Sequence, residues 1–86
     1  MLTIYYSDAS DVEKIDAHAP DNKLNGRHCT HFSTDNDDVK KVIAQENLTV
    51  FPVLLEINVV KVPDQDDQLA VIKLAEGIDA ILAYNA

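Results

Sequence analysis

The strongest strand signal in this chain is one long apolar run, and it constrains the fold more than any other feature. The run covers residues 53–62, reads Val-Leu-Leu-Glu-Ile-Asn-Val-Val-Lys-Val, and is rich in β-branched residues. Turn-forming residues follow at 63–67, and residues 69–74 then form a second strand-like stretch. We therefore predict an antiparallel hairpin that supplies one edge of a sheet.

The part of the chain before this hairpin alternates between strand-like and helix-like segments. Residues 2–6 and 28–33 are predicted strands. Helical spacing places apolar residues on one face in three segments: Val12, Ile15 and Ala19; Val39, Val42 and Ile43; and Ile78, Ile81 and Leu82. Because such alternation implies parallel neighbouring strands, we predict a single α/β domain over residues 1–86. Its four-stranded mixed sheet follows the order β-α-β-α-β-β-α, with helices on both faces.

Capping residues, proline and acidic residues predict where two of the helices begin or end. Ser10 and Glu13 have the spacing of a capping box, which predicts a helix start, and Pro20 is predicted to end that helix. Residues 34–38 predict a second helix start, because acidic side chains are favourable near the positive end of the helix dipole. Residues 21–27 are predicted to form a polar loop.

The charge of the chain restricts its partners. The chain has 86 residues with 15 acidic and seven basic side chains, which gives a formal net charge of −8. This charge opposes binding to nucleic acid or to an anionic membrane, since each needs a cationic surface. It is compatible with a basic protein partner, or with a protein that imitates DNA.

Two further features bear on location and redox state. No apolar run reaches the roughly 18–20 residues that cross a bilayer, and residues 1–6 lack the basic leader of a signal peptide. Cys29 is the single cysteine, so neither an internal disulfide nor an all-cysteine zinc site can form. A reducing, cytoplasmic location without membrane contact is therefore expected.

The order of these elements, with a proline just before the third strand, resembles the thioredoxin-fold superfamily, and most closely the small glutaredoxin-like proteins. Thr3-Ile4-Tyr5, followed by a five-residue turn region and a helix, is similar to the start of a glutaredoxin. Residues 34–39, then a helix, then Val50-Phe51-Pro52-Val53-Leu54-Leu55, are similar to the second half of that family. The family has a cis-proline before the strand, so the resemblance implies a cis Phe51–Pro52 bond.

The chain departs from this family at the redox motif. Counted forward from residues 4–5 without a gap, the Cys-x-x-Cys of the family falls on Ser10-Asp11-Val12-Glu13. Disulfide exchange needs a thiolate at the helix start and a second thiol that resolves the mixed disulfide. A serine hydroxyl and a carboxylate supply neither, so we predict no disulfide exchange here and assign no catalytic residue.

The other reactive side chains do not form a convincing site. On a strand, Cys29 and His31 point to one face and His28 to the other, so they cannot converge on a zinc ion with His18 unless the strand bulges. We predict no metal and no cofactor, and we interpret Cys29 as a small buried apolar residue. Ser10 has acidic neighbours but no histidine placed to act as its base, and helix capping explains it.

The remaining chemistry is binding. In thioredoxin-like folds, the start of the first helix and the cis-proline loop form a shallow groove that accepts extended peptide. Carried over to this chain, the groove consists of Ser10, Asp11, Val12, Val50, Phe51 and Pro52. The leading hypothesis is a redox-inactive thioredoxin-like protein that binds another protein through this groove, as an interaction module or modulator. Its small size and acidity suggest a viral source. Phe51 is either exposed in the groove or part of the core.

Two other functions stay open. An acidic inhibitor could imitate DNA if its carboxylates formed a row at roughly the spacing of DNA phosphates. The candidates for such a row are Asp35, Asp37, Asp38, Asp64, Asp66 and Asp67. A residual one-thiol glutaredoxin-like oxidoreductase would instead use Cys29.

Overall fold

The computed structural model describes residues 1–19, 21 and 23–84, which form a mixed α/β fold around one sheet. The elements along the chain are β1 (Leu2–Tyr6), α1 (Ala9–His18), β2 (Lys23–Leu24), β3 (Arg27–Ser33), α2 (Asp37–Glu46), β4 (Val53–Val60), β5 (Gln68–Glu76) and α3 (Ile78–Tyr84). The strand order across the sheet is β2-β3-β1-β4-β5. β1 is parallel to β3, whereas β1–β4, β4–β5 and β2–β3 are antiparallel. The predicted mixed sheet is therefore confirmed.

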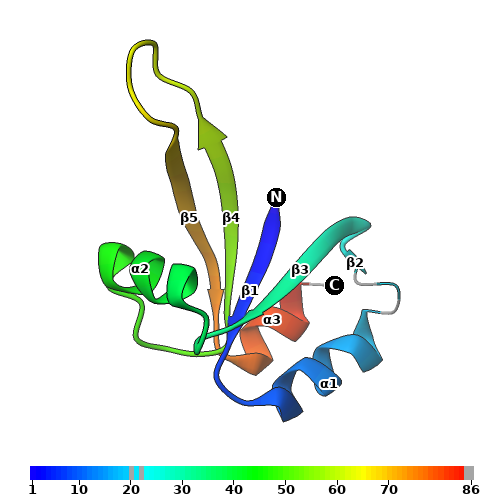
Figure 1. The fold of residues 1–86 in the computed structure, drawn as a ribbon. Coiled ribbons are helices and arrows are strands. Elements are labelled where there is room, and N and C mark those ends of the chain that lie inside the picture. The colour runs from blue at the N-terminus through cyan, green and yellow to red at the C-terminus, as the bar shows by residue number, and fades with distance from the viewer. Residues whose placement is uncertain (20, 22, 85–86) are drawn as a thin grey trace.

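Helices cover both faces of the sheet, as predicted (Figure 1). α1 and α3 pack on one face, where Ile15 and Ile81 join a buried cluster with Leu2, Ile4 and Leu54. α2 packs on the other face. There Val39 and Leu48 are buried against Tyr5, Val53 and Leu55. Alternation along β1 and β4 explains this division, because successive side chains of a strand point to opposite faces.

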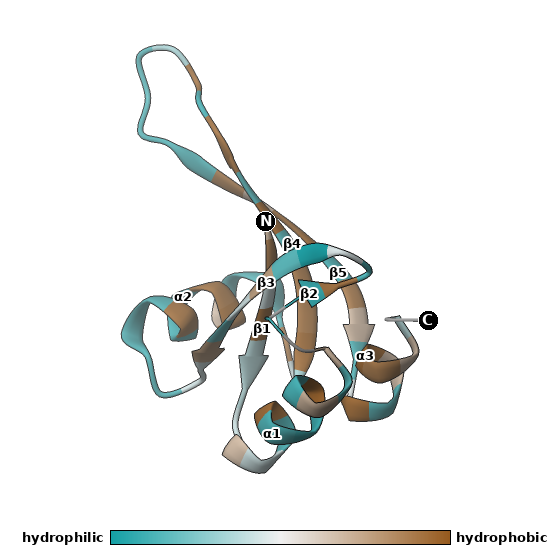
Figure 2. Ribbon diagram, turned by 90° about the vertical axis from the view of Figure 1, so that its right-hand side faces the viewer, coloured by the Kyte–Doolittle hydropathy of each residue, from teal (hydrophilic) through white to brown (hydrophobic). Residues whose placement is uncertain are grey.

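The β4–β5 hairpin extends beyond the helices, and in both views its loop is the part of the molecule that lies farthest from the helices (Figures 1 and 2). The register pairs Ile57 with Val71 and Val59 with Leu69, so these four side chains share one face. Val60 and Ile72 belong to the opposite face. Figure 2 shows that apolar residues continue into the projecting strands, while the loop between them is hydrophilic.

The described residues form a sheet of five strands, so the prediction of four was wrong. Residues 21–27 were predicted to be a loop, but within them Leu24 pairs with Arg27 across the turn Asn25-Gly26. Asn25 and Gly26 both have positive φ, 51° and 77°. Two successive residues of that kind match the twist of a tight hairpin, which allows the short β2 to pair with β3.

The capping box at Ser10 and Glu13 was also a wrong prediction. Asp8 is the N-cap of α1, and its Oδ1 accepts a hydrogen bond of 2.9 Å from the backbone N–H of Ser10. α1 therefore begins two residues earlier than the capping box implied, and Ser10 lies in its first turn. The helix ends at His18, and Pro20 lies outside the described residues.

Candidate functional site

The first half of the predicted groove lies at the start of α1. Ser10 is exposed, and Asp11 and Val12 are half-buried. The Asp11 carboxylate lies 4.0 Å from Nζ of Lys14, one turn further along the helix. Hydrogen bonding from Ser10 lowers the pKa of Asp8, so α1 begins with an ionised carboxylate at its N-cap.

The second half of the predicted groove is the loop before β4. Val50 is an exposed apolar side chain, with 42% of its surface accessible, while Pro52 is buried. The Phe51–Pro52 peptide bond is cis, as the resemblance implied. The carbonyl oxygen of Pro52 accepts a hydrogen bond of 2.8 Å from the N–H of Gly77, which ties this loop to the chain leaving β5.

The sheet register brings the two halves to one end of the molecule. Tyr5 pairs with Val53, so the chain leaves β1 and enters β4 at the same end of the sheet. Figure 1 shows both segments at this end, opposite the hairpin loop. We call the combination of residues 10–12 and 50–52 the sheet-end surface. Its exposed and half-exposed side chains include the carboxylate of Asp11 and the apolar side chain of Val50.

Phe51 contributes less to this surface than its size suggested. It is half-buried and packs against the cluster that contains Tyr5, Val39 and Val53. Of the two readings of this residue, the core role is the better description. Val50 is therefore the accessible apolar contact in this loop.

Cys29 lies away from the sheet-end surface. It pairs with Leu2 at the beginning of β1, four residues from Tyr6, which corresponds to about 13 Å along a strand. Its side chain is 2% exposed, and burial raises its pKa to about 11. A thiol that is protonated at neutral pH and shielded from solvent is a poor nucleophile. The prediction of a buried small residue is confirmed.

The histidines near Cys29 do not gather into a ligand set. His28 is exposed and His31 is half-buried. In the part of the chain that the structure describes, no three side chains among His, Cys, Asp and Glu are close enough to hold a metal ion. Burial lowers the pKa of His31, against an opposing effect from Asp16, so the imidazole is held in its neutral form.

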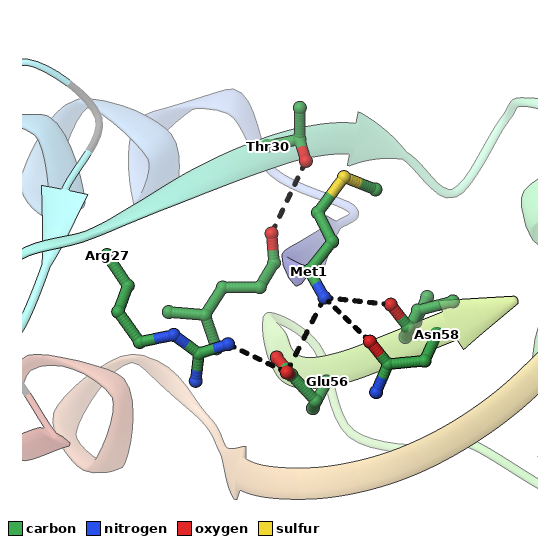
Figure 3. A network of polar contacts seen from close by, with 7 residues as sticks. Met1, Arg27, Thr30, Glu56 and Asn58 are labelled. Carbon is green, nitrogen blue, oxygen red and sulfur yellow. Dashed lines mark hydrogen bonds and ion pairs between the residues drawn. The ribbon is translucent and has the colours of Figure 1, made fainter.

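A polar network joins the start of β1 to β3 and β4 (Figure 3). Nη2 of Arg27 donates to Oε1 of Glu56 at 2.7 Å, and the N-terminal ammonium of Met1 lies 3.5 Å from the same oxygen. The ammonium also donates to the carbonyl of Ile57 at 2.9 Å and to Oδ1 of Asn58 at 3.3 Å. The hydrogen bond from Arg27 lowers the pKa of Glu56. We interpret this network as structural, because Oε1 of Glu56 on β4 holds both the ammonium that precedes β1 and the guanidinium of β3.

The acidic residues fall into two separate groups. Asp35, Asp37 and Asp38 lie at the start of α2, where Asn36 caps the helix. Asp64, Asp66 and Asp67 lie in the loop of the projecting hairpin. Figures 1 and 2 both place that loop at the far end of the molecule from the start of α2. The six carboxylates therefore do not form one continuous row.

Sequence reasoning missed a groove on the α2 face of the sheet. Its volume is about 780 Å³. Its apolar lining comes from Tyr5, Phe32, Val42, Ile57, Val59 and Leu69. We call this feature the α2 groove. Residues 53–62 and 69–74 were predicted as the strands of a hairpin, but only the sheet order shows that α2 leaves part of one face of these strands open.

Comparison with models of known protein families, with curated proteins and with solved structures finds no match to this chain. Within residues 1–19, 21 and 23–84, no helix is both long and apolar enough to cross a membrane.

Proposed function

We propose that this chain is a redox-inactive, thioredoxin-like module that binds another protein through the sheet-end surface. The observation that carries the proposal is that the same end of the sheet presents an accessible apolar side chain, Val50, and a helix start that holds carboxylates and no thiol. The mixed sheet, in which a parallel pair is followed by an antiparallel hairpin, supports the resemblance on which the proposal rests.

The chemistry of this surface favours an extended peptide with apolar and basic side chains. Val50 offers an apolar contact, and Asp8 and Asp11 offer negative charge at the same end of the sheet. The net charge of −8 adds long-range attraction for a basic partner.

The two other functions are less well supported. A one-thiol oxidoreductase would need Cys29 to be accessible and partly ionised, whereas it is 2% exposed with a raised pKa of about 11. A DNA mimic would need a continuous row of carboxylates, whereas the two acidic groups lie far apart (Figure 1).

The test begins with capture of a partner from nuclease-treated lysate, in the presence of reductant. The affinity of the purified partner is then measured for the original chain and for Val50→Lys. Because contacts at the centre of an interface dominate its energy, we expect Val50→Lys to weaken binding about tenfold or more. Val50 is exposed, so the substitution should not disturb the core.

Ile72→Lys is the matched control, since Ile72 is also an exposed apolar residue, 57% accessible, but lies on the projecting hairpin. The two variants change the net charge equally. If both weaken binding to the same extent, the effect is long-range electrostatics and the sheet-end surface is not the contact. If neither weakens binding, the proposal is also wrong.

A further inference from the structure

The two faces of the sheet are covered unequally. α1 and α3 both pack on one face, whereas α2 is the one helix on the other face within the described part of the chain (Figure 1). A sheet that exposes an apolar face gains stability when a second layer covers it. The α2 groove is the part of this face that α2 leaves open.

The floor of the α2 groove presents apolar side chains from four neighbouring strands. Phe32, Tyr5, Val59 and Leu69 come from β3, β1, β4 and β5, in the order in which these strands lie in the sheet. Tyr5 pairs with Phe32 and Val53, whereas Val59 pairs with Leu69 and lies six residues beyond Val53, about 20 Å along β4, so the groove runs lengthwise from Phe32 to Leu69. A helix of about 13 residues covers this length.

The exposure of these side chains favours a helix over a small ligand. Val59 is 58% exposed, Leu69 44% and Phe32 37%. Sites for small molecules are concave and bury most of the ligand, whereas this groove is open along the projecting hairpin. An amphipathic helix needs only one apolar face covered, and its other face can stay in water.

The charges around the α2 groove favour a partner with a positively charged surface. Asp38 lies at the rim with a side chain that is 94% exposed, and Asp35 and Asp37 flank it at the start of α2. The hairpin loop beyond Val59 and Leu69 carries three more carboxylates and one cation, Lys61. The cations that line the groove are each near a carboxylate: Lys41 lies 3.9 Å from Asp38, and the ammonium of Met1 lies 3.5 Å from Oε1 of Glu56. Carboxylates therefore remain in excess at both ends. A helix in the groove would have an acidic group near each end, which favours lysine and arginine on its polar face.

We propose that the α2 groove docks a basic amphipathic helix of another protein. The helix lies on the sheet beside α2, with its apolar face on the exposed side chains of Phe32, Val59 and Leu69. This site is separate from the sheet-end surface, and it does not depend on the function proposed above. A second copy of this chain is a poorer occupant, because each copy carries a net charge of −8 and the acidic groups would repel.

The probe is a synthetic helical peptide of leucine and lysine, with the leucines spaced to form one apolar face. It is titrated into the isotope-labelled full chain while the amide signals are followed by NMR. We expect shifts that concentrate on residues lining the α2 groove, such as Phe32, Val42, Ile57 and Leu69. A peptide of the same composition in scrambled order, without an apolar face, should bind about tenfold more weakly or worse.

Two pairs of matched variants separate the groove from general electrostatic attraction. Leu69→Lys and Val59→Lys place a charge in the groove, whereas Ile72→Lys and Val60→Lys place the same charge on the opposite face of the same hairpin. All four residues are exposed, so folding should be retained. We expect about a tenfold loss of affinity for each groove variant and less than about a threefold loss for each control.

Four results would overturn the proposal: no binding of the probe, equal binding of the scrambled peptide, equal losses in both classes of variant, or shifts confined to residues 10–12 and 50–52. Sedimentation of the chain alone gives a further test. A dimer that Leu69→Lys dissociates and Ile72→Lys does not would assign the groove to a second copy, contrary to the proposal.

Discussion

Thr3 holds a hydroxyl in the central strand β1 that has no hydrogen-bond partner among the described residues. The residue is 1% exposed and lies on the floor of the α2 groove. An unpaired buried hydroxyl keeps its desolvation cost without any compensating bond. Thr3→Val, which replaces the hydroxyl by a methyl group of similar shape, should therefore raise the free energy of unfolding by about 1 kcal/mol.

The measurement for Thr3→Val is urea unfolding, with the midpoint compared at an unchanged slope. A lower midpoint would show that the hydroxyl is stabilised by a contact that the structure lacks.

His31 makes stability depend on pH. Burial lowers its pKa in the folded state and the charge of His28 adds to this, while Asp16 acts in the opposite direction. The unfolded chain therefore binds more protons than the folded chain as pH falls through the ordinary histidine value of about 6.5. We expect the free energy of unfolding to decrease from pH 7 to pH 5, and His31→Phe to remove part of that decrease. An identical slope in the variant would contradict the role of His31.

At the scale of the element, α2 depends on one side chain for its start. Oδ1 of Asn36 accepts hydrogen bonds from the backbone N–H groups of Asp38 at 2.9 Å and Val39 at 3.3 Å. Asn36→Ala should lower the free energy of unfolding by about 1 kcal/mol, because both amides lose this partner. Asp35→Ala is the control, since it removes a neighbouring carboxylate but leaves the cap intact. An equal loss in both variants in thermal unfolding would rule out the capping explanation.

The helices and long strands were predictable because their apolar periodicity continues over several turns or pairs. β2 was missed because a strand of two residues, Lys23–Leu24, has no periodicity. The Asn25-Gly26 pair was nevertheless a usable hairpin signal. The sequence could not decide whether Asp8 or Ser10 caps α1, because aspartate and serine both cap helices. The path of the backbone after β1 determines which of the two does so.

At the scale of the whole molecule, the sequence predicted which residues lie at the sheet-end surface only through the resemblance. The pairing of Tyr5 with Val53 then places residues 10–12 and residues 50–52 at the same end of the sheet. The α2 groove could not be predicted in this way, because it depends on how far one helix covers a face built from four strands. Val59 and Leu69 have the same pattern as core residues, and their exposure comes from the extension of the hairpin beyond the helices (Figure 2).

The central claim is that this chain acts by binding a protein and not by thiol chemistry. The most direct measurement is capture of partners from lysate with reductant present, using the original chain and Cys29→Ala in parallel. We expect one dominant partner, recovered in equal amount by both chains, because Cys29 is buried and its pKa is raised to about 11. Recovery only when reductant is omitted, and loss of that partner in Cys29→Ala, would contradict the account.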